Sequence, residues 1–213
     1  MIKIQGKLPR KFILACSGGI DSMSALDFLR RNHEVIALYV NHGTVQSNTM
    51  QDCVVNYCQK NNLDVIVKTI GNKELPEKKS QEEHWRDERY RIIDAVSEEY
   101  ELPVVTCHHL DDCIETWVWS AMHGTPKIIP WNRRNTVVRP FRLTTKSVFR
   151  KWAERHKVPY VEDSSNSEMR YTRNYIRHVC IPHVKHINPG IEKMIAKKVL
   201  KSGPLPEASS NEK

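Results

Sequence analysis

Residues 11–22 have the sequence KFILACSGGIDS, and this stretch decides the fold. The first six residues are a short apolar run of the kind that forms a buried strand. Gly18 and Gly19 then allow a tight turn in which the backbone adopts positive φ and approaches an anion closely. Apolar side chains at helical spacing follow from Ser22. The stretch therefore predicts a strand, a phosphate-binding loop and a helix whose first amide groups favour negative charge.

Outward from this loop, apolar runs and helical patterns alternate along the first 126 residues. Strands are predicted at residues 11–16, 34–40, 64–70 and 102–107. Helices are predicted at residues 22–31, 47–61, 81–100 and 109–122. Such alternation is typical of an α/β, doubly wound parallel sheet with helices on both faces. Ligands of these folds bind beyond the carboxyl ends of the strands, which is where the glycine-rich loop falls.

The pattern changes beyond residue 126. We expect a loop-rich basic stretch at 126–140, then helices at 144–156, 171–184 and 188–200. The last residues are polar and contain proline, which predicts a disordered tail. We therefore divide the chain into an α/β core at 1–126, a small basic helical extension at 127–201 that completes the site, and a tail at 202–213.

Positive charge is concentrated in one segment. Residues 1–126 carry 14 Lys/Arg and 18 Asp/Glu, whereas residues 127–157 carry ten Lys/Arg and one acid, Glu154. A concentrated basic stretch is the footprint of a nucleic-acid partner, although a solvated basic face without a partner gives the same composition. No apolar run is long enough to span a membrane and no signal peptide is evident, so we expect a cytoplasmic protein.

The six cysteines do not form a Cys-x-x-Cys pair. We expect buried free thiols rather than a zinc site, an iron–sulfur site or a disulfide framework.

The glycine-rich loop carries the sharpest functional signal. Ser17 and Ser22 add hydroxyl donors, and Asp21 suits a Mg²⁺ ion that bridges to phosphate oxygens. The loop lacks the Gly-Lys-Ser/Thr ending of a Walker A motif and the Gly-x-Gly-x-x-Gly of a dinucleotide site. An ordinary tight turn with a serine cap is the alternative. The residues expected to hold the phosphates are Ser17, Gly18, Gly19, Ile20, Asp21 and Ser22.

Ser-Gly-Gly-x-Asp-Ser after a strand resembles the signature of the PP-loop, or N-type ATP pyrophosphatase, family. Members split ATP between the α and β phosphates, transfer AMP to a carbonyl-like oxygen and release pyrophosphate. The resemblance implies the adenine-nucleotide alpha hydrolase-like fold, with ATP and Mg²⁺ as ligands.

Two further stretches resemble motifs of one branch, the tRNA(Ile)-lysidine synthetases. Asn41 and His42 end the second predicted strand, near the adenine in PP-loop enzymes, although a plain strand-to-helix turn fits equally well. Glu82, Arg86 and Arg89 fall on one helix face, which on its own is equally typical of a surface salt-bridge row. The resemblance implies that this face recognises substrate or ATP, with Arg86 near the α-phosphate.

A third motif, HHLDDCIET at residues 108–116, opens the fourth predicted helix. Its carboxylates, close to a phosphate site, suit Mg²⁺ or a cationic substrate. Two adjacent histidines have poor spacing for one zinc ion. The motif closely resembles that of lysidine synthetases, and the resemblance implies that Asp112 helps to bind the lysine amine. The residues expected to line this substrate site are Glu82, Arg89, His108, Asp111, Asp112 and Glu115.

The most specific resemblance lies in the basic extension, in the pattern Asp-x-Ser/Thr-Asn at 163–166 followed by Arg-Asn-x-x-Arg-His at 173–178. Arg139 belongs to a matching Arg-Pro element upstream. Asp163 suits a helix-capping turn as well as a functional role. Basic residues here can meet tRNA phosphates. The residues expected to contact tRNA are Arg139, Asn166, Asn174 and Arg177.

Residues 11–187 thus resemble tRNA(Ile)-lysidine synthetases in order along the chain. In that family ATP adenylylates the C2 oxygen of the wobble cytidine (C34) of a CAU anticodon, and the lysine ε-amine displaces AMP. The resemblance implies tRNA(Ile) and free L-lysine as partners. It also implies catalytic roles for Asp21, Asp112, Arg86 and Arg173. A tRNA thiolase that uses the same activation, or a non-catalytic tRNA-binding protein, is the alternative.

One departure concerns length. Bacterial lysidine synthetases usually continue into one or two further carboxyl-terminal domains that help to grip tRNA, whereas this sequence ends soon after the matching region. The sequence leaves open the oligomeric state, with a homodimer as one option.

Overall fold

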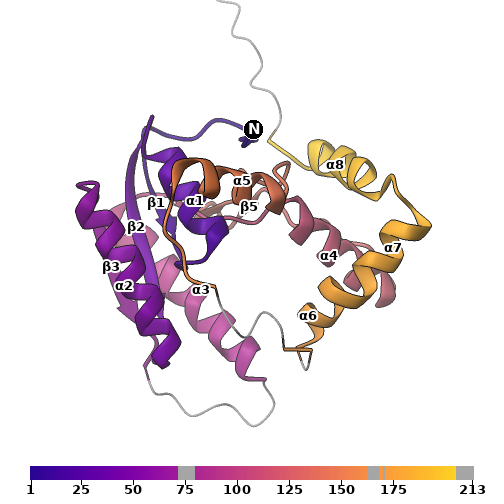
Figure 1. The fold of residues 1–213 in the computed structure, drawn as a ribbon, viewed down its shortest axis with the longest axis horizontal. Helices are drawn as coiled ribbons and strands as arrows, with labels where there is room; N and C mark the ends of the chain where they lie inside the picture. The colour runs from indigo at the N-terminus through magenta and orange to yellow at the C-terminus, as the bar shows by residue number, and fades with distance from the viewer. Residues whose placement is uncertain (72–79, 163–167, 170, 205–213) are drawn as a thin grey trace, which may run out of the picture.

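The computed structural model describes residues 1–71, 80–162, 168, 169 and 171–204, with the backbone alone at 81 and 82. The predicted α/β class is confirmed (Figure 1). The strands are β1 (Lys11–Ala15), β2 (Glu34–Asn41), β3 (Val65–Thr69), β4 (Val104–Val105), β5 (Asn132–Arg133) and β6 (Val137–Val138). The longer helices are α1 (Ile20–Leu29), α2 (Val45–Lys60), α3 (Gln81–Tyr100), α4 (Leu110–Met122), α5 (Lys146–His156) and α8 (Ile191–Lys201).

The sheet has the strand order β3-β2-β1-β4-β6-β5. All neighbours are parallel except β5 and β6, which form an antiparallel hairpin. The strand order reverses between β1 and β4, so the loop after β1 and the motif after β4 share one crevice. The stretch at 126–140 is loop-rich as expected, but it also contains the β5–β6 hairpin, which was not predicted. The domain boundary at 126 stays a prediction, although β6 carries the sheet beyond it.

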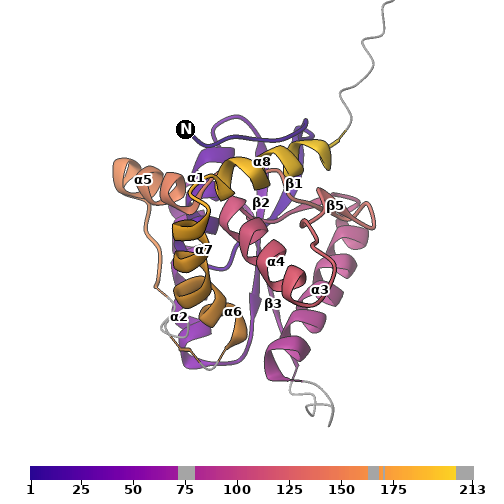
Figure 2. The same ribbon diagram turned by 90° about the vertical axis from the view of Figure 1, so that its right-hand side faces the viewer.

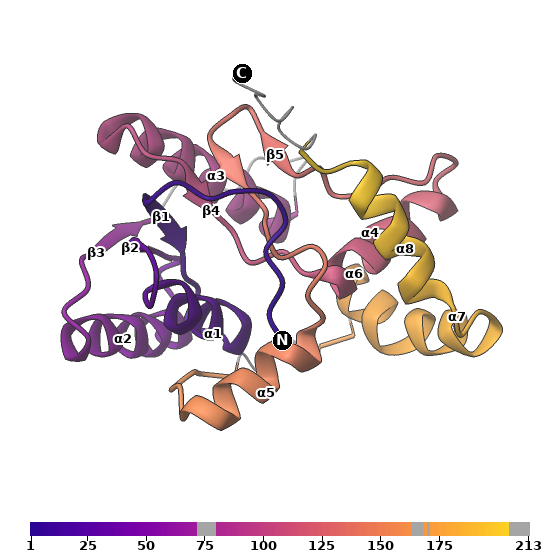
Figure 3. The same cartoon turned by 90° about the horizontal axis from the view of Figure 1, so that it is seen from above.

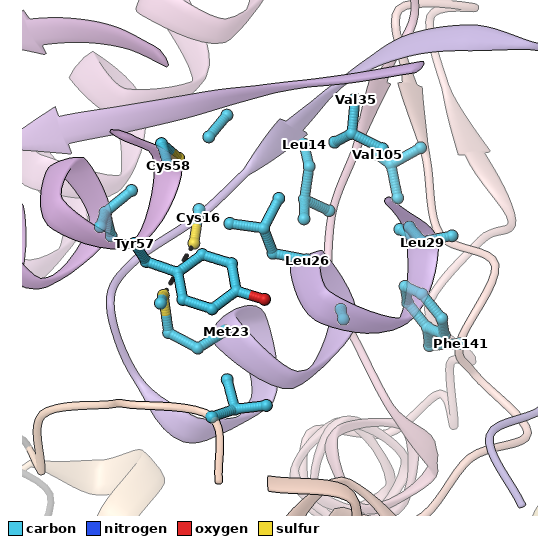
Figure 4. Close-up of a cluster of buried hydrophobic side chains, with 14 of the residues drawn as sticks. Leu14, Cys16, Met23, Leu26, Leu29, Val35, Tyr57, Cys58, Val105 and Phe141 are labelled. Carbon is cyan, nitrogen blue, oxygen red and sulfur yellow. Dashed lines mark hydrogen bonds between the residues drawn. The ribbon is translucent and has the colours of Figure 1, made fainter. Parts of the chain in front are cut away.

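Both faces of the sheet are buried, as a doubly wound fold requires. Side chains alternate along the strands: Phe12 and Leu14 of β1 pack on one face, whereas Ile13 packs on the other. The first face is covered by α1, α2 and α5, and the second by α3. Figure 4 shows Leu14, Leu26 and Tyr57 together on the first face. This packing fixes where β1 ends, and with it the glycine-rich loop.

A second, smaller core joins α4 to the carboxyl-terminal helices. Ile114 and Val118 of α4 pack with Ile191 and Ile195 of α8. The helices α6 (Thr172–Tyr175), α7 (Ile181–Ile187) and α8 lie together on the side of the molecule away from α2 (Figures 1 and 3). The basic extension is therefore held against the helix that follows β4.

The helix predicted at 171–184 contains a π-helical segment, η2 (Ile176–Cys180), between α6 and α7. The amide of Ile181 donates to the carbonyl of Ile176, five residues back, and Pro182 next in sequence has no amide to donate. Such widened turns change which side chains face a neighbour and are frequent at functional sites. Within the part of the chain described, no helix has both the length and the apolar character to cross a membrane.

Candidate functional site

The glycine-rich loop is held closed by its own serines. The Ser17 amide donates to Ser22 Oγ at 3.1 Å, and Ser22 Oγ donates to the Gly19 carbonyl at 3.0 Å. Gly18 has φ +79°, and a Cβ there would lie 2.9 Å from the carbonyl oxygen of Met50 in α2. Gly19 is the N-cap of α1, and no side chain caps this helix start. The loop thus presents amide donors at the positive end of a helix dipole, which suits phosphate.

His109, the N-cap of α4, connects this loop to the acidic motif. Its Nε2 lies 3.6 Å from Asp21 Oδ2, and its Nδ1 lies 3.5 Å from a carboxylate oxygen of both Asp111 and Asp112. Burial alone would lower the pKa of His109, but these three carboxylates outweigh it and raise the pKa to about 9. The ring is therefore protonated at neutral pH. The 3.4 Å contact from the Asp112 amide to Nδ1 is too long to oppose this.

Asp112 and Glu115 are bound by two arginines of the basic extension. Arg173 donates to Asp112 Oδ1 at 2.7 Å and to Glu115 Oε2 at 3.0 Å. Arg177 donates to Glu115 Oε1 at 2.6 Å. Burial would raise the pKa of Asp112, but the positive charges of His109 and Arg173 hold it well below its usual range. The predicted roles of these residues stay predictions, and their two buried carboxylates and two partly exposed guanidinium groups form one cluster.

The other members of the acidic motif have different environments. Asp111 Oδ2 accepts the Lys146 amide at the start of α5 at 2.8 Å, which fixes α5 to α4. His108 Nδ1 lies 2.9 Å from Thr106 Oγ1. Burial lowers the pKa of His108 to about 3; Asp112 opposes this, and the positive charges of Arg139, Arg173 and Arg86 add to it. His108 is thus a neutral ring in a region of positive potential, next to a charged His109.

At the end of β2, the predicted adenine residues also organise a turn. Asn41 Oδ1 accepts the Gly43 amide at 2.7 Å, and its Nδ2 donates to Asn48 and Gln51 in α2. The His42 ring lies 5.3 Å from the ring of Trp85 in α3. The side chain of Asn41 is therefore fully engaged within the fold, and its contact with adenine stays a prediction.

On α3, the guanidinium of the exposed Arg86 lies 5.3 Å from the centre of the Tyr90 ring. Arg89 is exposed one turn away. Glu82 is described by its backbone alone, and Asn166 and Asp163 lie outside the described residues. In the extension, Asn174 Nδ2 donates to the Glu168 carbonyl at 3.0 Å and is buried.

Sequence reasoning missed His109 as a site residue. It was adjacent to the chosen His108, and its position three residues before Asp112 matches an N-cap whose backbone amide donates to the Asp112 carboxylate, at 2.9 Å in the structure. That signal indicates a residue tied to Asp112, although it does not reveal the contact with Asp21. Tyr90, which accepts a hydrogen bond from Arg139 at 3.4 Å, was also missed.

Asp21 fits a role in holding Mg²⁺. Its Oδ1 is buried without a hydrogen-bond partner, beside the phosphate loop. Within the described residues no group of three or more His, Cys, Asp and Glu side chains could hold a metal by itself. Mg²⁺ in phosphate sites is usually bound by one or two carboxylates together with the substrate's phosphates, so a single free carboxylate oxygen is consistent with this use.

The sequence is similar to those of curated tRNA(Ile)-lysidine synthases. The chain is 33% identical to the tRNA(Ile)-lysidine synthase of Persephonella marina, over 85% of this chain and 43% of that protein. It is 30% identical to the tRNA(Ile)-lysidine synthase of Thermotoga maritima, over 88% of this chain and 48% of that protein. The chain thus spans less than half the length of these curated relatives.

Solved structures share the fold. The U34-tRNA thiolase NcsA from Methanococcus maripaludis with its [4Fe-4S] cluster gives a TM-score of 0.74 at 16% identity, over 92% of this chain and 73% of that one. The NH3-dependent NAD synthetase of Campylobacter jejuni gives 0.53 at 16% identity, over 95% of this chain and 90% of that one. Residues 2–184 match the family described as PP-loop domain (ATP_bind_3). This chain therefore belongs to the PP-loop domain family, with its signature loop at the end of β1.

Proposed function

We propose that this chain ligates lysine to C2 of the wobble cytidine of tRNA(Ile) with a CAU anticodon, and that ATP activates the cytidine. The C2 oxygen attacks the α-phosphorus of ATP, and pyrophosphate leaves. The lysine ε-ammonium gives up a proton to water, and the resulting uncharged amine attacks C2. The C2–O bond breaks, AMP leaves, and the new C–N nitrogen releases a second proton to water. The lysidine synthase relatives and the membership of the PP-loop family support this reaction.

One observation carries the proposal: His109 joins the phosphate loop to the acidic motif. It contacts Asp21 on one side and Asp111 and Asp112 on the other, all within 3.6 Å. A nucleotide on the loop is therefore next to carboxylates that can bind an ammonium group. Adjacent sites for ATP and for an amine are what two-step ligation needs, because the activated base must remain in place between the steps.

The residues then take distinct roles. The backbone amides of Gly18 and Gly19 and the start of α1 bind pyrophosphate, and Asp21 holds the Mg²⁺ that supplies charge neutralisation for the phosphates. Arg86 and Arg173 stabilise the charge that develops on the α-phosphate. Asp112 binds the incoming lysine: a carboxylate has about four lone-pair positions, and among the described residues only the His109 amide and Arg173 donate to it within 3.0 Å, so capacity remains for a further donor beside Arg173, Arg177 and His109.

A cytidine in an anticodon loop is unpaired, which suits the reaction. Proteins that read RNA sequence usually take bases from single-stranded loops and splay them out. The predicted tRNA contacts on Arg139, Asn166, Asn174 and Arg177 belong to this step.

The test is ATP–pyrophosphate exchange that depends on tRNA(Ile) with a CAU anticodon, followed by mass spectrometry of the tRNA after incubation with lysine and ATP. We expect exchange and a lysine adduct on the wobble cytidine. Asp112→Asn should reduce ligation by roughly 10²-fold, the usual loss for one electrostatic group in a site. Asp52→Asn is the matched control, because Asp52 is exposed on α2. An adduct of sulfur would show a thiolase instead, and unchanged tRNA without exchange would indicate a non-catalytic binder.

A further inference from the structure

A cleft separates α3 from the β5–β6 hairpin, which lies beside that helix (Figures 2 and 3). Its volume is about 350 Å³. Five arginines and two aspartates line it, a formal net charge of +3: Arg86, Arg91, Arg133, Arg134, Arg139, Asp87 and Asp94. Tyr90 forms its inner wall. The phosphate loop is not part of the cleft, which makes it a second place for an anion.

One of the two lining aspartates is already neutralised. Asp94 accepts from Arg133 Nη1 at 2.9 and 3.0 Å, and from Thr136 Oγ1 at 3.0 Å. The same guanidinium lies 4.4 Å from the Tyr90 ring centre. Arg91 is paired with Glu88 at 2.9 Å, but 60% of its side chain is exposed, so solvent screens that pair. The cleft keeps an excess of positive charge after these pairs are counted.

Arg139 is the residue that indicates a ligand. It is 4% exposed, and among the described residues its guanidinium donates to the Pro130 carbonyl and to the Tyr90 hydroxyl alone, at 3.1 and 3.4 Å. Its Nε is buried without a hydrogen-bond partner. Among the described residues, none with a carboxylate forms an ion pair with it. A buried guanidinium without a counterion is costly, and an anion that enters the cleft would relieve that cost.

The cleft borders the proposed catalytic site. Val138 of β6 pairs with Val105 of β4 and its carbonyl accepts the Thr106 amide at 2.9 Å, so Arg139, the next residue, lies beside the chain end that leads to His108. At the other end, Arg134 is exposed at the hairpin tip. A chain of phosphates that left the site past His108 would therefore meet Arg139 first and Arg134 last.

We propose that this cleft is a phosphodiester-binding subsite, which takes the RNA backbone next to the nucleotide under modification. The inference rests on the proposed function in one respect, that RNA enters the site. It adds a surface that the lysidine reaction does not itself require. Arginine suits this surface because its planar guanidinium matches phosphate geometry with two parallel donors.

The test measures binding of a fluorescent RNA stem–loop with a CAU loop to the full chain, by anisotropy at several salt concentrations. The double variant Arg91→Gln, Arg134→Gln should weaken binding about tenfold or more near 0.1 M salt. It should also flatten the slope of log K against log salt by about 1.5. Asp87→Asn, which removes a negative charge from the cleft, should strengthen binding. The control Arg10→Gln changes an arginine that is 87% exposed at the amino end of β1 and should change neither quantity.

The outcomes separate the subsite from the reaction. If the double variant binds RNA like the wild type, or the wild type binds no RNA, the subsite is wrong even where ligation occurs. If the double variant loses RNA binding while the wild type forms no lysine adduct, the subsite stands and the proposed reaction fails. A third measurement uses inorganic phosphate and records the thermal stability of the wild type and of the double variant. If phosphate stabilises the wild type but not the double variant, and the two proteins bind RNA equally well, the cleft binds a free anion instead of RNA.

Discussion

Gly18→Ala should destabilise the fold through two separate costs at the phosphate loop. Gly18 has φ +79°, a conformation that costs a residue with a Cβ about 1–2 kcal/mol. The added Cβ would lie 2.9 Å from the Met50 carbonyl oxygen and 3.0 Å from the Met50 Cβ. Neither atom is the flexible end of a side chain, so α1 and α2 must separate, at about 1–3 kcal/mol. The free energy of unfolding should therefore fall by about 2–5 kcal/mol.

The adjacent Gly19→Ala is the matched control. Gly19 has φ −79°, and its added Cβ would meet only Ser17 Oγ, at 3.6 Å. We expect a change within about 1 kcal/mol, since the weaker N-cap preference of alanine opposes its lower entropy in the unfolded chain. Urea unfolding followed by far-UV circular dichroism measures both variants. Equal effects of the two substitutions, or a loss below about 1 kcal/mol for Gly18→Ala, would refute the close packing of this loop against α2.

Three further predictions concern charged groups. The pKa of His109 is raised from 6.5 to about 9, so its stabilising effect is complete below pH 6.5 and is lost as pH rises through 9. Between pH 7 and 8 the free energy of unfolding should therefore fall by roughly 1.4 kcal/mol per pH unit. The variant His109→Gln should lose this dependence on pH, whereas the control His123→Gln, at an exposed position, should retain it. A double-mutant cycle on Arg177 and Glu115, whose side chains are 22% and 5% exposed, should give a coupling of about 1–3 kcal/mol. The same cycle on the exposed pair Arg10 and Glu34 should give less than about 0.5 kcal/mol, and equal couplings would contradict the burial of the cluster. Arg142 is fully buried and donates to the Ile129 carbonyl, Gln5 and Ser202. Arg142→Ala leaves these acceptors unpaired, so it should lower the free energy of unfolding in urea by about 3–5 kcal/mol. A decrease of less than about 1 kcal/mol would show that water replaces the guanidinium.

The sequence predicted the α/β architecture well because the four strands of its first 126 residues, β1 to β4, lie in short apolar runs. After their exposed first residues, Lys11 and Glu34, β1 and β2 are continuously apolar up to the terminal Asn41 of β2, as strands buried on both faces must be, and short turn signals separate them from their helices. The position of the glycine-rich loop between β1 and α1 followed from the same pattern, although α1 begins at Ile20, two residues before the predicted start at Ser22. These features depend on neighbours in sequence, so local reasoning reaches them.

The β5–β6 hairpin escaped prediction for the opposite reason. Its strands have two residues each, too few for an alternating pattern, and its turn uses Arg134 and Asn135 with φ of 52° and 59° rather than a glycine. Pairing with β4 stabilises it, and that contact joins residues more than 30 apart in sequence. Likewise, the spacing of Arg173 and Arg177 indicated one helix face but not that this face meets Asp112 and Glu115. Tertiary packing of α4 with η2 and α8 decides that partner.

The structure also changes the meaning of the basic segment at 127–157. Three of its ten basic residues are taken up inside the protein: Arg133 by Asp94, Arg139 under Tyr90, and Arg142 by neutral acceptors near the chain's two ends. Arg139 can meet a phosphate only within the cleft, and the other seven can face phosphates at the surface, so net charge overstates the positive surface offered to RNA. Only exposed charges release counterions when RNA binds. A folded Arg142→Ala variant should therefore show the same salt dependence of RNA binding as the wild type, whereas Arg134→Gln should show a weaker one. Equal salt slopes for Arg142→Ala and Arg134→Gln would show that total charge, rather than its placement around the cleft, governs RNA binding.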